Sequence, residues 1–226
     1  MKRALVIGLV LITTCLIFSS SSFSADRPCA SCNQQEFKDL FDTQLATLKD
    51  RGCPEQIVDM LNDQRDNVVG KALAMNFERD RIPFLPVIPR AYITLYSQMA
   101  MVRYKDKAGF VLPNHKEFTD VPKTPAVPYY VFDVEDGTAM LGQSAQDAEK
   151  LIKKQSRRGL TEIEVIALVV HTDVISRHNV DAIGSCGDSC WVPDLWMWPT
   201  SIRPMLGQNP RNMANEHWGA ASCRNK

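Results

Sequence analysis

The N-terminus of the chain has the three-part pattern of a secretory signal peptide. Lys2 and Arg3 form a short basic segment, and an uncharged, largely apolar stretch follows over residues 4–18. About 15 such residues suit the apolar region of a signal peptide and are too few to cross a hydrocarbon core of about 30 Å. Small side chains at Ser22 and Ser24 favour cleavage after Ser24. We therefore expect the rest of the chain to fold outside the cytoplasm, as a periplasmic or secreted protein.

The exported part is long enough for a hydrophobic core and is nearly neutral. The full sequence has 26 basic and 26 acidic residues, so loss of Lys2 and Arg3 leaves the remainder slightly acidic. Such a surface does not attract nucleic acid or an anionic membrane, and we expect neither as a partner. No other segment approaches the ~18 apolar residues that a membrane span needs, so we expect no span after cleavage.

Cysteines are concentrated near the two ends of the exported chain. Cys15 leaves with the signal peptide, and the other six are Cys29, Cys32, Cys53, Cys186, Cys190 and Cys223. An even number of cysteines in an exported protein favours structural disulfides, because the compartment is oxidising. The spacing does not choose among the many pairings that six thiols allow.

Two close pairs leave a second interpretation of the cysteines open. Cys29 and Cys32 form a C-x-x-C pair, and Cys186 and Cys190 form a C-x-x-x-C pair. Together these four thiolates could bind zinc. Cys32 would also lie near the N-terminus of the following helix, which lowers the pKa of a thiol and favours redox chemistry.

The segment after the first cysteines predicts a helical hairpin. Apolar residues recur at helical spacing over residues 34–51, and Gly52 suits the position just after a helix. Pro54 suits the first turn of a second helix. We divide the chain into a signal peptide (1–24), a cysteine-containing helical hairpin (25–80) and an α+β globular domain (81–226).

The larger domain predicts helices packed on a small antiparallel sheet. Residues 129–134 form the clearest strand, and Asp136-Gly137 directly after it is a hairpin signal. Ser144 can cap one helix, and Thr161-x-x-Glu164 is a capping box for the next. Helices and hairpin strands in this arrangement are typical of an α+β fold.

A series of short motifs runs through this domain. They are Tyr-Tyr-Val-Phe-Asp-Val-Glu-Asp-Gly (129–137), Arg-Gly-Leu-Thr-Glu-Ile-Glu (158–164), Val-Pro-Asp-Leu-Trp (192–196), Pro-Met-Leu-Gly (204–207) and Gly-Ala-Ala-Ser-Cys (219–223). In this order they resemble an uncharacterised bacterial domain family of unknown function, over residues 82–223. The resemblance implies no activity and no catalytic residues. The N-terminal cysteine hairpin looks like an addition to that family's domain.

No motif of a common hydrolase, zinc protease or nucleotide-binding enzyme is present, and no motif indicates a cofactor. Candidate sites are therefore groups of side chains. Asp133 and Glu135 alternate on a predicted strand and could act as acid and base, although such residues more often form the solvated face of a hairpin. Asp194 is a third candidate, since it precedes two tryptophans by a few residues.

The tryptophans form the second candidate group. Trp196 and Trp198 share a face if residues 194–198 are extended, and Trp191 lies close by in sequence. Exposed aromatic rings can stack on sugar rings, and the alternative is that these rings fill a core beside disulfides.

Three functions remain open. The favoured one is a disulfide-stabilised binding or structural domain, because a catalytic signature is lacking. The second is an extracytoplasmic polymer hydrolase that uses Asp133, Glu135 or Asp194 beside the tryptophans. The third is a zinc or redox protein that uses the two close cysteine pairs.

Overall fold

The structure is a computed structural model that describes residues 34–78, 80–186 and 191–225. The predicted signal peptide and Cys29, Cys32 and Cys190 lie outside these residues. Within the described ranges, no helix combines the length and apolar character that crossing a membrane requires.

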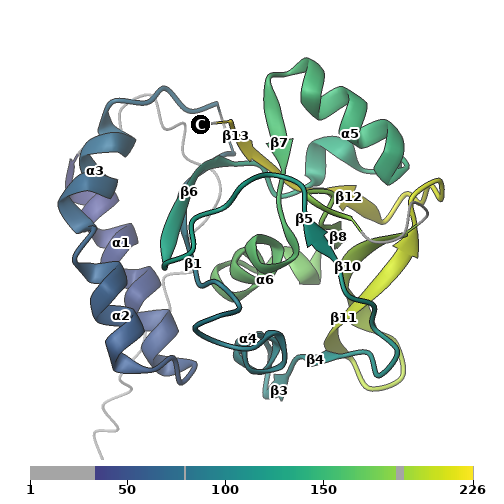
Figure 1. Cartoon of the computed structure of the whole chain (residues 1–226), viewed down its shortest axis with the longest axis horizontal. Coiled ribbons are helices and arrows are strands. Elements are labelled where there is room, and N and C mark those ends of the chain that lie inside the picture. Colours follow the sequence, from purple (N-terminus) through teal and green to yellow (C-terminus); the bar gives the residue numbers. More distant parts are fainter. Residues whose placement is uncertain (1–33, 79, 187–190, 226) are drawn as a thin grey trace, which may run out of the picture.

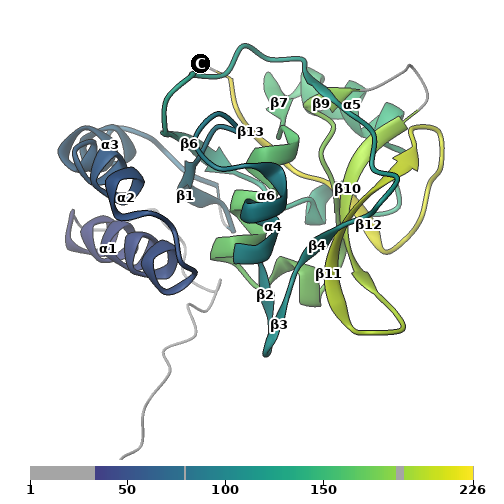
Figure 2. The same ribbon diagram turned by 60° about the horizontal axis from the view of Figure 1, so that its bottom comes forward.

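Three helices form the N-terminal part: α1 (Gln34–Asp50), α2 (Glu55–Asn62) and α3 (Arg65–Leu73). They stand together on one side of the molecule (Figures 1 and 2). Helix α1 buries the side chains that its spacing predicts, namely Phe37, Phe41, Gln44, Leu45 and Leu48. The third helix was not predicted, because it has no side-chain cap and Gly70 lies in its interior.

Strands β1 (Ile82–Val87) and β6 (Tyr129–Val134) form an antiparallel two-stranded sheet between these helices and α6 (Glu162–His171) (Figure 1). Strand β1 pairs with β6 alone among the described strands, as expected for a strand that contains Pro83 and Pro86. Phe84 of β1 is nevertheless fully buried and lies against Phe41 of α1 and Tyr130 of β6. Aromatic contacts therefore fasten the N-terminal helices to this sheet.

The main sheet has five strands in the order β12-β8-β10-β11-β4. Their bounds are Trp218–Ala220 for β12, Asn179–Asp181 for β8, Trp191–Trp198 for β10, Arg203–Pro210 for β11 and Phe110–Val111 for β4. Strand β10 is antiparallel to both neighbours, whereas β4 and β12 run parallel to theirs. The fold is α+β as predicted, but this sheet is mixed rather than wholly antiparallel.

Helix α6 lies in the middle of the fold, and every residue from Glu162 to Val170 is buried. Helix α4 (Leu95–Met101) and the short helical turn η3 (Val174–Ser176) pack against it, whereas α5 (Ala145–Lys154) and the turn η2 (Thr138–Met140) contact strand β12. The remaining strands pair as β13 (Ser222–Arg224) with β7 (Arg157–Gly159), β2 (Arg103–Tyr104) with β3 (Lys107–Ala108), and β5 (Thr119–Asp120) with β9 (Ser185–Cys186).

Both predicted helix caps are present. The hydroxyl of Ser144 accepts a hydrogen bond from the backbone N–H of Asp147 at 3.1 Å, which starts α5. The carboxylate of Glu164 accepts from the backbone N–H of Thr161 at 2.8 Å, which starts α6. These contacts are local in sequence, and this is why the sequence predicts them.

The Asp136-Gly137 turn does not make the predicted hairpin. Strand β6 pairs with β1, and Gly137, with φ of 106°, leads into η2 instead of a returning strand. The turn meets β12 at a very close backbone contact: a Cβ on Gly219 would lie 2.1 Å from the carbonyl oxygen of Gly137. A contact distant in sequence thus decides the role of this turn.

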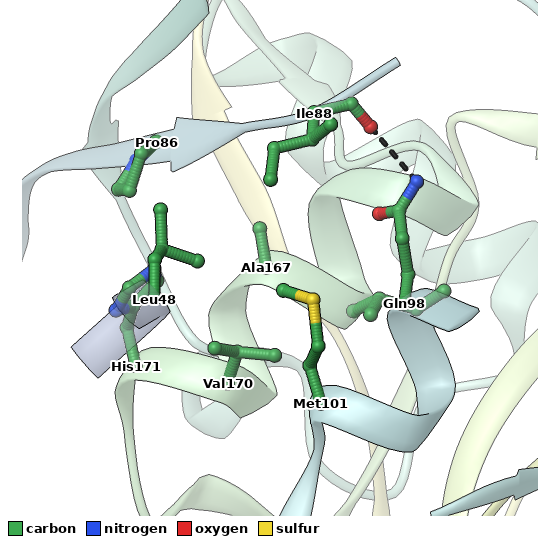
Figure 3. A pocket seen from close by; sticks show the side chains of 9 residues that line it. Leu48, Pro86, Ile88, Gln98, Met101, Ala167, Val170 and His171 are labelled. Atoms are coloured by element: carbon green, nitrogen blue, oxygen red, sulfur yellow. Dashed lines mark hydrogen bonds between the residues drawn. The ribbon is translucent and has the colours of Figure 1, made fainter. Parts of the chain in front are cut away.

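A small cavity of about 10 Å³ lies where α1, α4 and α6 meet (Figure 3). Its walls include Leu48, Met101, Val170 and His171, and Gln98 closes one side by donating to the carbonyl oxygen of Ile88 at 2.9 Å. The Nε2 atom of His171 is buried and has no hydrogen-bond partner among the described residues. Burial, with a contribution from Arg51, lowers the pKa of His171 to about 3, so the imidazole is neutral at ordinary pH.

Candidate functional site

Two tryptophans on β10 form a partly exposed pair, which we call the tryptophan ledge. The pairing of β10 with β11 is continuous from Trp191 opposite Pro210 to Trp198 opposite Arg203, so side chains alternate without interruption. Trp196 and Trp198 therefore share one face, with ring centroids 5.5 Å apart and ring planes at 71°. This edge-to-face geometry is favourable for aromatic rings.

Trp191, the third tryptophan in the candidate group, does not belong to the ledge. Trp191 is an odd number of residues from the ledge and projects from the opposite face of β10. The Nζ atom of Lys116 lies 4.9 Å from the centroid of its ring, a cation–π contact. The structure thus brings together two of the three tryptophans that the sequence singled out.

Asp194 lies on the same face of β10 as the ledge and is buried, with 1% of its surface exposed. Directly opposite it on β8 is Asp181, which is 3% exposed. Asn209 of β11 donates its side-chain N–H to Asp194 Oδ2 at 2.9 Å. Among the described residues, the Oδ1 atoms of both aspartates have no hydrogen-bond partner.

The environment of this pair favours the protonated carboxyl. Burial raises the pKa of Asp181 to about 7. Burial raises the pKa of Asp194 well above its ordinary value, and the charge of Asp181 adds to this effect against the opposing hydrogen bond from Asn209. The sequence does not indicate Asp181 or Asn209 as site residues, since only the strand register places them beside Asp194.

Strand β11 is the other neighbour of β10, and its Gly207 is paired with Asp194. A Cβ at this position would lie 3.0 Å from Trp196 Nε1 and 3.2 Å from Asp194 Oδ1. The indole and the carboxyl group therefore both pack over the bare backbone of Gly207. This places the ledge in contact with the same small region as the aspartate pair.

The other two candidate carboxylates have structural contacts. Asp133 is 6% exposed, and its Oδ2 accepts from Arg157 Nη1 at 2.7 Å. Glu135 is 7% exposed and accepts from the backbone N–H of Ala139 at 2.8 Å. Both are on or beside β6, so the structure places them on a different sheet from Asp194.

The densest group of buried charges lies at the start of α6. Glu162 and Glu164 are both fully buried. Glu162 is bonded to Arg90 and to His115 Nε2, the latter at 2.5 Å, and its backbone N–H donates to Ser185 Oγ at 2.9 Å. A negative charge in the first turn also interacts favourably with the helix dipole.

The buried carboxylate of Glu164 also accepts hydrogen bonds from side chains distant in sequence. Both terminal nitrogens of Arg158 donate to its carboxylate, at 2.7 and 2.8 Å, and the hydroxyl of Tyr129 donates at 2.8 Å. The capping box predicts only the local contact of Glu164. Its partner Tyr129 is 35 residues away and Arg90 of the Glu162 pair is 72 residues away, so no local signal could have revealed this network.

The described cysteines, Cys53, Cys186 and Cys223, are free, and no disulfide joins any two of them. Burial raises the pKa of Cys53 to about 11 and that of Cys223 to about 12, so both thiols stay protonated and unreactive. Among the described residues, no three His, Cys, Asp or Glu side chains lie together as a metal site would require. Pairings among Cys53, Cys186 and Cys223 are therefore not seen, and the other predicted pairings, like the four-cysteine zinc site, involve cysteines that lie outside the described residues.

The fold and the site define an α+β domain with a surface tryptophan pair and buried ion pairs around a central helix. The chain belongs to the family described as "Family of unknown function (DUF5701)", which matches residues 40–223. The match includes α2 and α3, so these helices belong to the family's domain and are not an addition to it. No curated protein and no solved structure matches the chain.

Proposed function

We propose that the protein is an exported binding domain that holds a saccharide through the tryptophan ledge. The observation that carries this proposal is the partly exposed, edge-to-face pair of Trp196 and Trp198 on one strand face. Tryptophan side chains are mostly buried on average, and two that remain partly accessible side by side offer apolar surface for sugar rings. Export is supported by the signal-peptide pattern of residues 1–24.

The burial of the candidate carboxylates favours binding over hydrolysis. A glycoside hydrolase needs two carboxyl groups that reach the glycosidic bond from either side. Asp133 is engaged by Arg157, Glu135 caps the turn after β6, and Asp194 is covered by the sheet. None of the three offers a free oxygen at the surface beside the ledge.

We also propose that disulfides stabilise the exported protein near its two ends, including the cysteine-containing helical segment. Cys186 is the partly exposed thiol among the described cysteines, and Cys190 follows it closely in sequence. Mass spectrometry with thiol alkylation of the unfolded protein, before and after reduction, tests this, because buried thiols such as Cys53 and Cys223 are protected in the folded protein even when free. Full protection before reduction supports disulfides, whereas four thiols released together with a metal ion support the zinc alternative.

The binding proposal is tested with the natively exported protein and a panel of insoluble polysaccharides: peptidoglycan, chitin and cellulose. We expect retention on at least one polymer, and we expect W196A/W198A to weaken binding about tenfold or more. W191A is the matched control, because it removes a partly exposed tryptophan from the other face of the same strand. Absence of binding to all three polymers, or an equal loss in W191A, contradicts the proposal.

A further inference from the structure

The carboxyl groups of Asp181 and Asp194 form a buried pair beside the tryptophan ledge, and ionisation of both would destabilise the fold. Asp194 and Asp181 are directly opposite each other on the antiparallel strands β10 and β8. Residues in that relation project from the same face with Cβ atoms about 5 Å apart, and like charges there destabilise the pairing. Both side chains are withdrawn from water, which makes a second negative charge more costly still.

No described cation neutralises the pair. Among the side chains that the structure describes, Asn209 alone has a hydrogen bond to the pair, and it is uncharged. The charged groups on the packed elements are bonded elsewhere. Arg203 on β11 donates to the carbonyl oxygen of Ala108, and after η3 Arg177 is bonded to Asp136 and His178 to Thr138. On α6, Glu162 and Glu164 are bonded to their arginines, and His171 is neutral. On α5, Lys150 and Lys153 are bonded to acids of their own helix, and on β9 Cys186 is a free cysteine. Strand β12 carries no ionisable side chain.

We propose that Asp181 and Asp194 share one proton and that this pair makes the tryptophan ledge sensitive to pH. In the singly protonated state, the carboxylic acid of one aspartate donates to the carboxylate of the other, and the contact joins β8 to β10. When the proton leaves to solvent, two carboxylates face each other and repel. The effect on ligand binding rests on the proposed function, whereas the proton-sharing pair itself does not.

The link to the ledge is the space over Gly207. Trp196 Nε1 and Asp194 Oδ1 both border the position that a Cβ on Gly207 would occupy. A displacement of the Asp194 carboxylate away from Asp181 is therefore directed at the indole of Trp196. The ledge is expected to hold its edge-to-face geometry at mildly acidic pH and to change on the alkaline side.

The direction of the pH effect follows from the raised pKa values. A carboxyl group whose folded-state pKa is raised stabilises the fold fully below the ordinary pKa of about 4. That stability is lost as the pH rises through the folded-state pKa, which is about 7 for Asp181. Because of this pair, the fold should be less stable at mildly alkaline pH than at mildly acidic pH.

The experiment uses the ligand-free exported protein, with urea unfolding followed by tryptophan fluorescence at pH 5 and pH 8.5. The titration of His171 acts in the opposite direction over this range, so every protein in the comparison carries H171L. We expect the unfolding midpoint of the H171L protein to fall by ~1 M urea between these conditions. D181N and D194N should lose at least half of that fall, because an amide donates to the remaining carboxylate at both pH values. D59N, at an exposed position of α2, should keep the full fall.

A second readout does not depend on the variants folding well. The native fluorescence of the unchanged protein should change with a midpoint between about pH 6 and pH 8, and W196F should lose most of that change. Equal urea midpoints at the two pH values, or an undiminished fall in D181N and D194N, would overturn the proposal. Since no polysaccharide is present, these results stand or fall separately from the binding proposal.

Discussion

At the scale of single residues, Asp133 shows how burial fixes the role of a carboxylate. Its backbone has a positive φ of 55°, which Asp and Asn tolerate better than most residues. Arg157 donates to its carboxylate and its carbonyl oxygen, and also to Ser222 Oγ at 3.0 Å. One arginine thus joins β6, β7 and β13, and the carboxylate balances its charge.

We predict that D133A destabilises the protein by about 3–5 kcal/mol, because it leaves the guanidinium of Arg157 buried without its counter-charge. D133N removes the same charge but keeps an acceptor oxygen for Arg157 and tolerates the same backbone conformation, so it should lose less stability than D133A. Urea unfolding of the two variants measures the difference. A loss below about 1 kcal/mol in D133A would show that the ion pair does not hold these strands together.

At the scale of helices and strands, the sequence predicts contacts between near neighbours correctly and does not predict contacts between distant residues. Ser144 and Thr161 were predicted as caps because each needs only a partner three residues away. The Asp136-Gly137 signal misled, because the close approach of Gly219 is 82 residues distant and leaves no local trace. The Asp181–Asp194 pair was missed for the same reason, although Asp194 itself was a candidate.

Replacement of Ser144 tests the cap of α5. We predict that S144A costs about 1 kcal/mol, because the N–H of Asp147 loses its acceptor at the start of the helix. S144N retains a capping oxygen and should lose only a few tenths of that amount. Chemical unfolding of both variants is the measurement, and equal stability of S144A and the unchanged protein would refute the capping role.

Two glycines provide a matched pair of substitutions with opposite expected signs. Gly70 lies inside α3 with no atom within 4 Å of an added Cβ, so G70A should stabilise the protein by about 0.5–1 kcal/mol. At Gly219 the added Cβ would meet the backbone of Gly137, so G219A should destabilise by at least about 2 kcal/mol. Thermal unfolding of both variants checks the pair, and a tolerated G219A would contradict the close contact of β12 with the turn.

At the scale of the whole molecule, the N-terminal helices, the β1–β6 sheet, α6 and the main sheet share one hydrophobic core. A smaller cluster beneath α5 includes Met140, Ile183 and Val192. The α+β class and several helices could be predicted from composition and spacing. The mixed sheet and the buried ion pairs at α6 could not, because they depend on strands and loops that meet across long stretches of sequence.

His171 should lower the stability of the protein as the pH falls below about 6.5. A histidine whose folded-state pKa is lowered stabilises the fold above its ordinary pKa of about 6.5, and this stability is lost as the pH falls toward the folded-state value of about 3. We predict that H171L, relative to the unchanged protein, gains about 1–2 kcal/mol between pH 7.5 and pH 5. Unfolding at the two pH values measures this gain, and an equal response of both proteins would mean that His171 accepts a proton in the folded state.

Oxidative footprinting of the exported protein, with and without the polysaccharide that retains it, tests whether the tryptophan ledge is the surface that binds the ligand. We expect the bound polymer to protect Trp196 and Trp198 from oxidation, while Trp191 and Trp218 react at the same rate in both samples. Protection of Trp191 or Trp218 with unchanged reactivity at the ledge would place the ligand on another face and overturn the proposed binding surface.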